Sequence, residues 1–231
     1  MWQFLPKFAT ELSDLVLSRE CIGCEELGTL LCAACRHEVS GRAHIMWDLR
    51  IDDLAEDLRI PLAIAYRYGP PIDAMIYRYK DSQIPELASV LSTLLADSIQ
   101  QLDLNEPGSG QKPILIPIPS RRPSIKSRGF DPLVLISRHL SHAGSPIAHW
   151  LIDQRTAGRS KTLGTADRKN ASYDAFRVRA IPDRYVRNPI PAIVIDDVAT
   201  SGTTFTAAVS QLLLSGVHVS GCAAIAGARK L

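Results

Sequence analysis

Two adjacent carboxylates and a run of small hydroxyl residues lie close together in the second half of this 231-residue chain. Asp196 and Asp197 end an apolar segment that is predicted to be a buried strand, and the run TSGTT (200–204) leads into a predicted helix. A tight loop that enters a helix points its backbone N–H groups at one place, which favours a phosphate group. The carboxylates suit the neighbouring hydroxyl groups of a sugar. Together the two parts predict a site for a ribose 5-phosphate group.

The phosphate is expected to contact the whole run, which consists of Thr200, Ser201, Gly202, Thr203 and Thr204. Gly202 allows close approach of the backbone, and the hydroxyls supply donors. The alternative is that the aspartates cap the start of a helix and that the run is only a turn. The position after a buried strand favours a ligand site, because ligands of open α/β sheets collect at the carboxyl ends of strands. The chain has no G-x-x-x-x-G-K-S/T phosphate loop.

Four of the five cysteines form two C-x-x-C pairs near the start of the chain. Two such pairs bring four thiolates to one ion, and Zn²⁺ is the metal that this pattern is typical of. The expected ligands are Cys21, Cys24, Cys32 and Cys35. Four protein ligands leave no open position, so the zinc is expected to be structural. The alternative, two structural disulfides, is disfavoured because the chain shows no secretion signal.

Apolar patterning predicts the elements that must position these residues. Strands are predicted at 62–68, 113–119, 149–152, 191–197 and 217–227, and helices at 1–20, 70–80, 85–102, 131–143 and 203–216. An acidic segment at 48–59 is expected to be a helical link, and the polar segment 153–172 a loop. Strands that alternate with helices form a mostly parallel sheet. The prediction is an α/β fold over residues 46–231 that follows a zinc module at 1–45.

Charge is distributed unevenly along the chain, although its net value is only +2. Residues 121–187 contain fourteen Lys and Arg against five Asp and Glu, a net charge of +9, so the rest of the chain carries −7. This favours a basic surface for phosphate-rich ligands, and scattered solvated charges are the alternative. No apolar run approaches the roughly 20 residues that cross a bilayer, and the N-terminus does not resemble a signal peptide. A cytoplasmic location is therefore expected.

Three basic side chains are candidates for contacting an anion. Lys80 ends a predicted helix, and a solvated helix-end lysine is the alternative. Arg128 belongs to a basic turn directly after the strand at 113–119, on the ligand side of the sheet. Arg168 lies in the long polar loop, which is expected to close over a ligand, to contact nucleic acid or simply to be solvated.

The sequence IVIDDVATSGTT (193–204) resembles the motif with which type I phosphoribosyltransferases bind 5-phosphoribosyl 1-pyrophosphate (PRPP). Over nearly its full length the chain also resembles the ComF family of competence-associated phosphoribosyltransferase-like proteins. The cysteine pairs, IYRYKD (76–81), ILIPIPSRRPSIKSRGFD (114–131) and DRKNASYDAF (167–176) occur in that family's order. The resemblance implies the type I phosphoribosyltransferase fold, with Asp196 and Asp197 on the ribose hydroxyls and residues 200–204 around the 5-phosphate.

The resemblance leaves three functions open. A transferase would displace pyrophosphate from PRPP with a nitrogen acceptor, with Mg²⁺ on the pyrophosphate. A competence protein would handle single-stranded DNA together with the DNA-uptake machinery, and a regulator would sense PRPP without transfer. In the family a glycine usually follows the lysine run, whereas Asp81, Ser82 and Gln83 follow Lys80 here. PRPP binding and PRPP turnover are therefore separate expectations.

Overall fold

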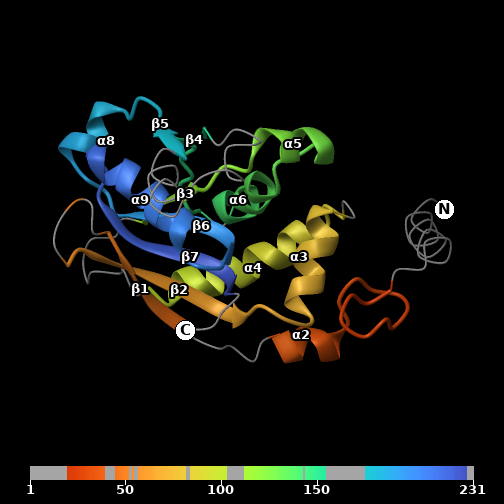
Figure 1. Cartoon of the computed structure of the whole chain (residues 1–231). Coiled ribbons are helices and arrows are strands. Elements are labelled where there is room, and N and C mark those ends of the chain that lie inside the picture. Colours follow the sequence, from red (N-terminus) through yellow and green to blue (C-terminus); the bar gives the residue numbers. More distant parts are fainter. Residues whose placement is uncertain are drawn as a thin grey trace, which may run out of the picture.

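A five-stranded sheet with the strand order β1-β2-β7-β6-β3 forms the centre of the computed structural model (Figure 1). The structure describes residues 20–39, 45–51, 54, 57–81, 84–102, 112–142, 144–154 and 175–227. The strands are β1 (Ile45–Arg50), β2 (Arg59–Arg67), β3 (Ile114–Pro117), β6 (Ala192–Ala199) and β7 (Val219–Gly227). Within this five-stranded sheet only the β1–β2 pair is antiparallel, which confirms the mostly parallel α/β sheet predicted from the sequence.

The central strands are buried because their sequences are apolar without alternation, as in parallel sheets covered on both faces. Residues 192–195 of β6 and residues 222–226 of β7 are all buried. β6 pairs with β3 on one side and with β7 on the other. The carboxyl ends of these three parallel strands therefore lie side by side, and this is the edge of the sheet to which the sequence assigns the ligand.

Seven described helices accompany the sheet: α2 (Ala33–Val39), α3 (Ile72–Lys80), α4 (Leu87–Gln100), α5 (Arg122–Arg128), α6 (Pro132–His142), α8 (Asp183–Arg187) and α9 (Thr203–Leu214). α4 packs on β2, β7 and α6, and α9 packs on β6 and β7, the two strands that it connects. Gly216, with a φ of 80°, follows the end of α9 as predicted. None of the described helices is long and apolar enough to cross a membrane.

The segment 48–59 was expected to be helical, and that prediction is wrong. It contains the end of β1 and the start of β2, which pair antiparallel from Ile45 and Ile64 to Arg50 and Arg59. The reason is a period of two, because Trp47 and Leu49 are buried while their neighbours in β1 are exposed. The acidic composition of the segment conceals this alternation.

The basic segment after β3 was expected to be a turn, and it is the short helix α5. Proline in its first turn starts it, and Gly129, with a φ of 80°, ends it. The strand expected at 149–152 is β4 (Leu151–Asp153), which does not join the main sheet but pairs with β5 (Phe176–Val178). The predicted helix at 1–20 lies outside the described residues except for Glu20.

Ser98 connects α4 to the sheet. Its fully buried hydroxyl donates a hydrogen bond to the carbonyl of Ala224 in β7 (2.6 Å) and accepts one from the N–H of Ala65 in β2 (3.1 Å). One small side chain therefore links a helix with two neighbouring strands. Buried polar groups need such partners because their hydration is lost on folding.

We expect Ser98→Ala to lower the free energy of unfolding by about 1–3 kcal/mol, because the buried Ala65 N–H loses its acceptor. Urea denaturation measures this change. Ser89→Ala is the matched control, since Ser89 lies on the exposed side of the same helix, and it should change stability by less than about 0.5 kcal/mol. Equal stability of the two variants would contradict the prediction.

Candidate functional site

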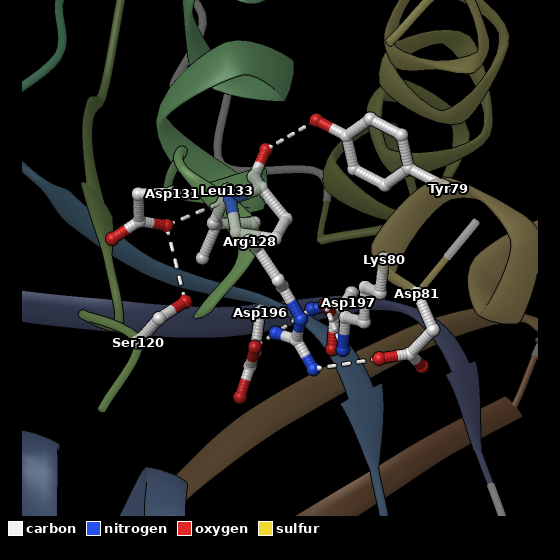
Figure 2. A network of polar contacts seen from close by, with 10 residues as sticks. Tyr79, Lys80, Asp81, Ser120, Arg128, Asp131, Leu133, Asp196 and Asp197 are labelled. Carbon is white, nitrogen blue, oxygen red and sulfur yellow. Dashed lines mark hydrogen bonds and ion pairs between the residues drawn. The ribbon is translucent and has the colours of Figure 1, made fainter. Parts of the chain in front are cut away.

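Asp196 and Asp197 lie inside β6, near its carboxyl end, rather than after it, because the strand continues to Ala199. Asp197 is buried and Asp196 is half-buried. The N–H of Asp197 donates to Oδ1 of Asp196 (2.8 Å), which holds the first carboxylate against the backbone. Successive side chains of a strand point to opposite faces, and the two carboxylates leave β6 in different directions (Figure 2). Each can therefore meet a different group.

Lys80, the last residue of α3, forms an ion pair with Asp197 through its Nζ atom. Burial alone would lower the pKa of Lys80, but the charge of Asp197, its hydrogen bond and the charge of Asp196 raise that pKa above its usual value. A raised folded-state pKa stabilises the protein below the unfolded pKa and loses this effect as pH rises through the folded pKa. Lys80 is therefore protonated throughout the neutral range.

Arg128, the last residue of α5, is the second cation at this place. Its Nη2 atom lies 3.3 Å from Oδ1 of Asp81, the residue that follows Lys80. Figure 2 shows the guanidinium between Asp196 and the Lys80–Asp197 pair, and the charge of Arg128 acts on the pKa of Lys80. Two of the three basic candidates from the sequence therefore meet the two aspartates, whereas the third, Arg168, lies outside the described residues.

A set of hydrogen bonds and a ring contact, separate from the ion pairs, fixes the ends of α3 and α5 relative to each other. The Tyr79 hydroxyl donates to the carbonyl of Pro132 at the start of α6 (2.6 Å), and its ring lies 5.7 Å from that of Phe130. Oδ1 of Asp131 accepts from the N–H of Leu133 (3.1 Å) and from the hydroxyl of Ser120 (3.1 Å), and so caps α6. Burial, and then the charges of nearby aspartates, raises the pKa of Tyr79, which keeps it a hydrogen-bond donor.

Sequence reasoning did not identify this positioning role of Tyr79, which is buried. The available signal was Asp131 directly before Pro132, since aspartate is a preferred cap and proline a preferred first residue of a helix. The residues connected by dashed lines in Figure 2 come from the end of α3 and Asp81 after it, from the segment 120–133 and from β6.

The loop 200–202 connects β6 to α9, which begins at Thr203. Gly202 has a φ of 77°, and a Cβ atom there would lie 2.7 Å from Cδ2 of Leu49 in β1. Glycine is therefore required by both backbone conformation and space. No side chain caps α9, so the aspartates do not serve as its cap. Ser201 and Thr203 are exposed, with their hydroxyl oxygens 2.7 Å apart.

The four cysteines of the two C-x-x-C pairs meet at one point. Their Sγ atoms all lie within 4.8 Å of one another, with 3.6 Å between those of Cys24 and Cys32. A tetrahedral zinc with bonds of about 2.3 Å places its sulfur ligands roughly 3.8 Å apart, so the cluster fits the ion. All four cysteines are free thiols, which excludes the alternative of two disulfides in this structure.

Backbone N–H groups donate hydrogen bonds to two of the sulfur atoms, those of Cys21 and Cys32. The N–H of Cys32 lies 3.3 Å from Sγ of Cys21, and the N–H of Cys35 lies 3.4 Å from Sγ of Cys32. Burial alone would raise the pKa of Cys21, but the amides of Cys32, Cys24 and Gly23 lower it to about 6. Gly23 is packed so tightly that a Cβ atom would lie 2.6 Å from Sγ of Cys35.

Cys222, the fifth cysteine, is fully buried in β7, as its apolar context predicts. Burial raises the pKa of its thiol. It lies outside the cysteine cluster and serves as a core residue.

Comparison with known proteins gives relatives of modest similarity, and no family model matches the chain. The chain is 28% identical over 163 residues to the DNA utilization protein YhgH of Salmonella typhi. It is 29% identical over 160 residues to the DNA utilization proteins YhgH of Salmonella typhimurium and of Escherichia coli K12. Each match covers 64% of this chain and 63% of the relative, so the matched region spans less than two thirds of these relatives' length.

We expect the purified chain to contain one zinc ion, and we expect Cys35→Ser to lose it because the remaining three sulfur atoms leave the tetrahedron incomplete. Metal content measured by mass spectrometry tests this, with Cys222→Ala as the control that removes a buried thiol outside the cluster. Zinc retained at the wild-type level in Cys35→Ser, or absent from the wild-type chain, would contradict the assignment.

Proposed function

We propose that this chain acts in the utilization or uptake of DNA and that it binds a ribose 5-phosphate ligand, most simply PRPP, at the end of β6. The first part is supported by the relatives, which are DNA utilization proteins at 28–29% identity. The second part is supported by geometry, together with the resemblance of residues 193–204 to a PRPP-binding motif.

The observation that carries the ligand proposal is the meeting of Lys80 and Arg128 with Asp196 and Asp197 at one strand end. In the free protein these cations are balanced by carboxylates of the protein itself. A ligand with both hydroxyl groups and phosphates offers hydrogen-bond donors to the aspartates and negative charge to Lys80 and Arg128. It would place its hydroxyls on the aspartates and its pyrophosphate near the two cations.

The 5-phosphate fits the start of α9 in the same proposal. The loop 200–202 leaves the first N–H groups of the helix without a side-chain cap, and exposed hydroxyls of Ser201 and Thr203 lie beside them. A phosphate dianion there satisfies these donors and interacts favourably with the helix dipole. Oxygen ligands suit Mg²⁺, but among the described residues only the cysteines form a group that could hold a metal. We therefore propose Mg²⁺ as a companion of the pyrophosphate rather than as a resident ion.

Transfer of the ribose 5-phosphate group is a further step in this proposal. The bond from C1 to pyrophosphate would break, a bond from C1 to an acceptor nitrogen would form, and pyrophosphate would leave with its negative charge balanced by Lys80 and Arg128. The residues of the site would contribute positioning and charge neutralisation rather than a covalent intermediate. A regulator that senses PRPP uses the same contacts without an acceptor.

We expect isothermal titration calorimetry to show binding of PRPP in the presence of Mg²⁺, and we expect Asp196→Asn with Asp197→Asn to weaken binding by tenfold or more, about 1.4 kcal/mol. The reason is that the neutral amides are weaker acceptors for the ribose hydroxyls. Asp48→Asn is the control, since Asp48 is an exposed aspartate of β1, and circular dichroism checks that each variant is folded. No heat of binding at millimolar PRPP would overturn the ligand proposal. Pyrophosphate release with a panel of bases then separates a transferase from a regulator.

Disruption of the gene in its own host should reduce growth on DNA supplied as a nutrient or reduce transformation by added DNA. Re-expression of the wild-type chain should restore the lost function. Expression of the Asp196→Asn, Asp197→Asn chain should fail to do so, because the proposal links the ligand site to the role in DNA. Unchanged growth and unchanged transformation after disruption would contradict that role.

A further inference from the structure

A cluster of arginines and aromatic rings lies on β4, β5 and α8, outside the site described above. In Figure 1, α8 lies on the left of the molecule, whereas α3 and α5, which carry Lys80 and Arg128, lie on the right. The segment 175–187 contains four arginines and one aspartate. Within the described part of the chain, none of these arginines forms an ion pair.

Strand pairing places two of the arginines on one face. β4 and β5 are antiparallel, with Ile152 opposite Arg177, and the N–H of Arg179 donates to the carbonyl of Trp150 (2.8 Å). Residues opposite each other in such a pair share a face. Leu151 and Phe176 are buried on one face. On the other face Arg177 and Arg179 are both exposed, although Trp150 beside them is buried.

Aromatic rings lie next to this basic face. Trp150 packs against Tyr185 of α8 with 5.3 Å between ring centroids and an angle of 59° between the planes. The guanidinium of Arg184 lies 4.7 Å from the centroid of the Tyr185 ring. Arg184 is exposed and Tyr185 is only half-buried. A planar group from outside can therefore stack on the guanidinium or take its place on the ring.

We propose that this surface, formed by Arg177, Arg179, Arg184 and Tyr185, with the buried Trp150 packed behind Tyr185, binds a single-stranded nucleic acid. Arginines would contact phosphates, and Tyr185 with Arg184 would stack on a base. The inference rests on the proposed role in DNA utilization or uptake and assigns that role a contact surface. A single strand fits better than a duplex, because stacking on a side chain requires a base that is free of its neighbours.

Binding can be measured by fluorescence anisotropy with the full-length chain and a labelled oligothymidylate of about 20 nucleotides. We expect the wild-type chain to bind, with an affinity that falls steeply between about 50 and 200 mM salt. The pair Arg177→Ala, Arg179→Ala should weaken binding by about tenfold or more and should reduce the salt dependence by about two phosphate contacts. The matched control is the pair Arg59→Ala, Arg138→Ala, which removes the same charge from exposed positions on β2 and α6.

Stacking has its own test. Arg184→Ala and Tyr185→Leu should each weaken binding with little change in salt dependence, and the tryptophan fluorescence change on binding should disappear in Trp150→Phe. Oligouridylate of equal length shows whether DNA or RNA is bound in preference. No binding of either oligonucleotide, equal effects of the two arginine pairs, or equal binding of a duplex would overturn the proposal.

The two proposals fail in different ways. A chain that binds PRPP in calorimetry but binds no oligonucleotide removes only the arginine surface. A chain that binds oligothymidylate through Arg177 and Arg179 but binds no PRPP removes only the ligand site. Normal growth on DNA and normal transformation after gene disruption remove the role in DNA, whatever the purified chain binds.

Discussion

The ion pair between Lys80 and Asp197 is the interaction on which the site depends, because it joins the end of α3 to the central strand β6. Asp197 is buried near the carboxyl end of β6, where an ionised carboxylate without a partner would destabilise the fold. The charges of Asp197 and Asp196 in turn keep Lys80 protonated, against the effect of burial. Arg128 and Asp81 extend the same arrangement by one further pair, at 3.3 Å. The two ion pairs therefore connect β6 with the end of α3, and the end of α3 with the end of α5.

Hydrogen bonds outside the ion pairs hold the helix ends that carry these charges. The hydrogen bond from Tyr79 to the carbonyl of Pro132 and the cap that Asp131 provides for α6 hold the helix ends in place. Gly202 then lets β1 approach the loop before α9, since any larger residue would meet Leu49. Such support matters for a ligand site, because long charged side chains are effective only when their geometry is held before the ligand arrives.

The cysteine cluster bears on the stability of the segment 20–39 rather than on the site at β6. Residues 20–39 contribute few apolar side chains, although Ile22 and Leu31 join the same apolar core as the sheet. A short segment of this kind gains order from a metal more readily than from a core of its own. A zinc ion held by four sulfur ligands would have no open position for a substrate. A zinc ion bound by this cluster would therefore stabilise the fold, and the cluster is separate from the candidate site at the end of β6.

The sequence by itself determined the central strands, the main helices and the cysteine cluster, because each depends on local patterns of apolar residues or on fixed spacing. It misled at residues 48–59, where acidic composition hid a period of two, and at α5, where a basic segment was taken for a turn. Only the tertiary structure decided that Lys80 pairs with Asp197, that Arg128 pairs with Asp81, and that Arg184, Tyr185 and Trp150 stack beside two exposed arginines. Apart from the contact of Arg184 with its neighbour Tyr185, these contacts join segments far apart in the chain, and their geometry follows from strand order and helix packing.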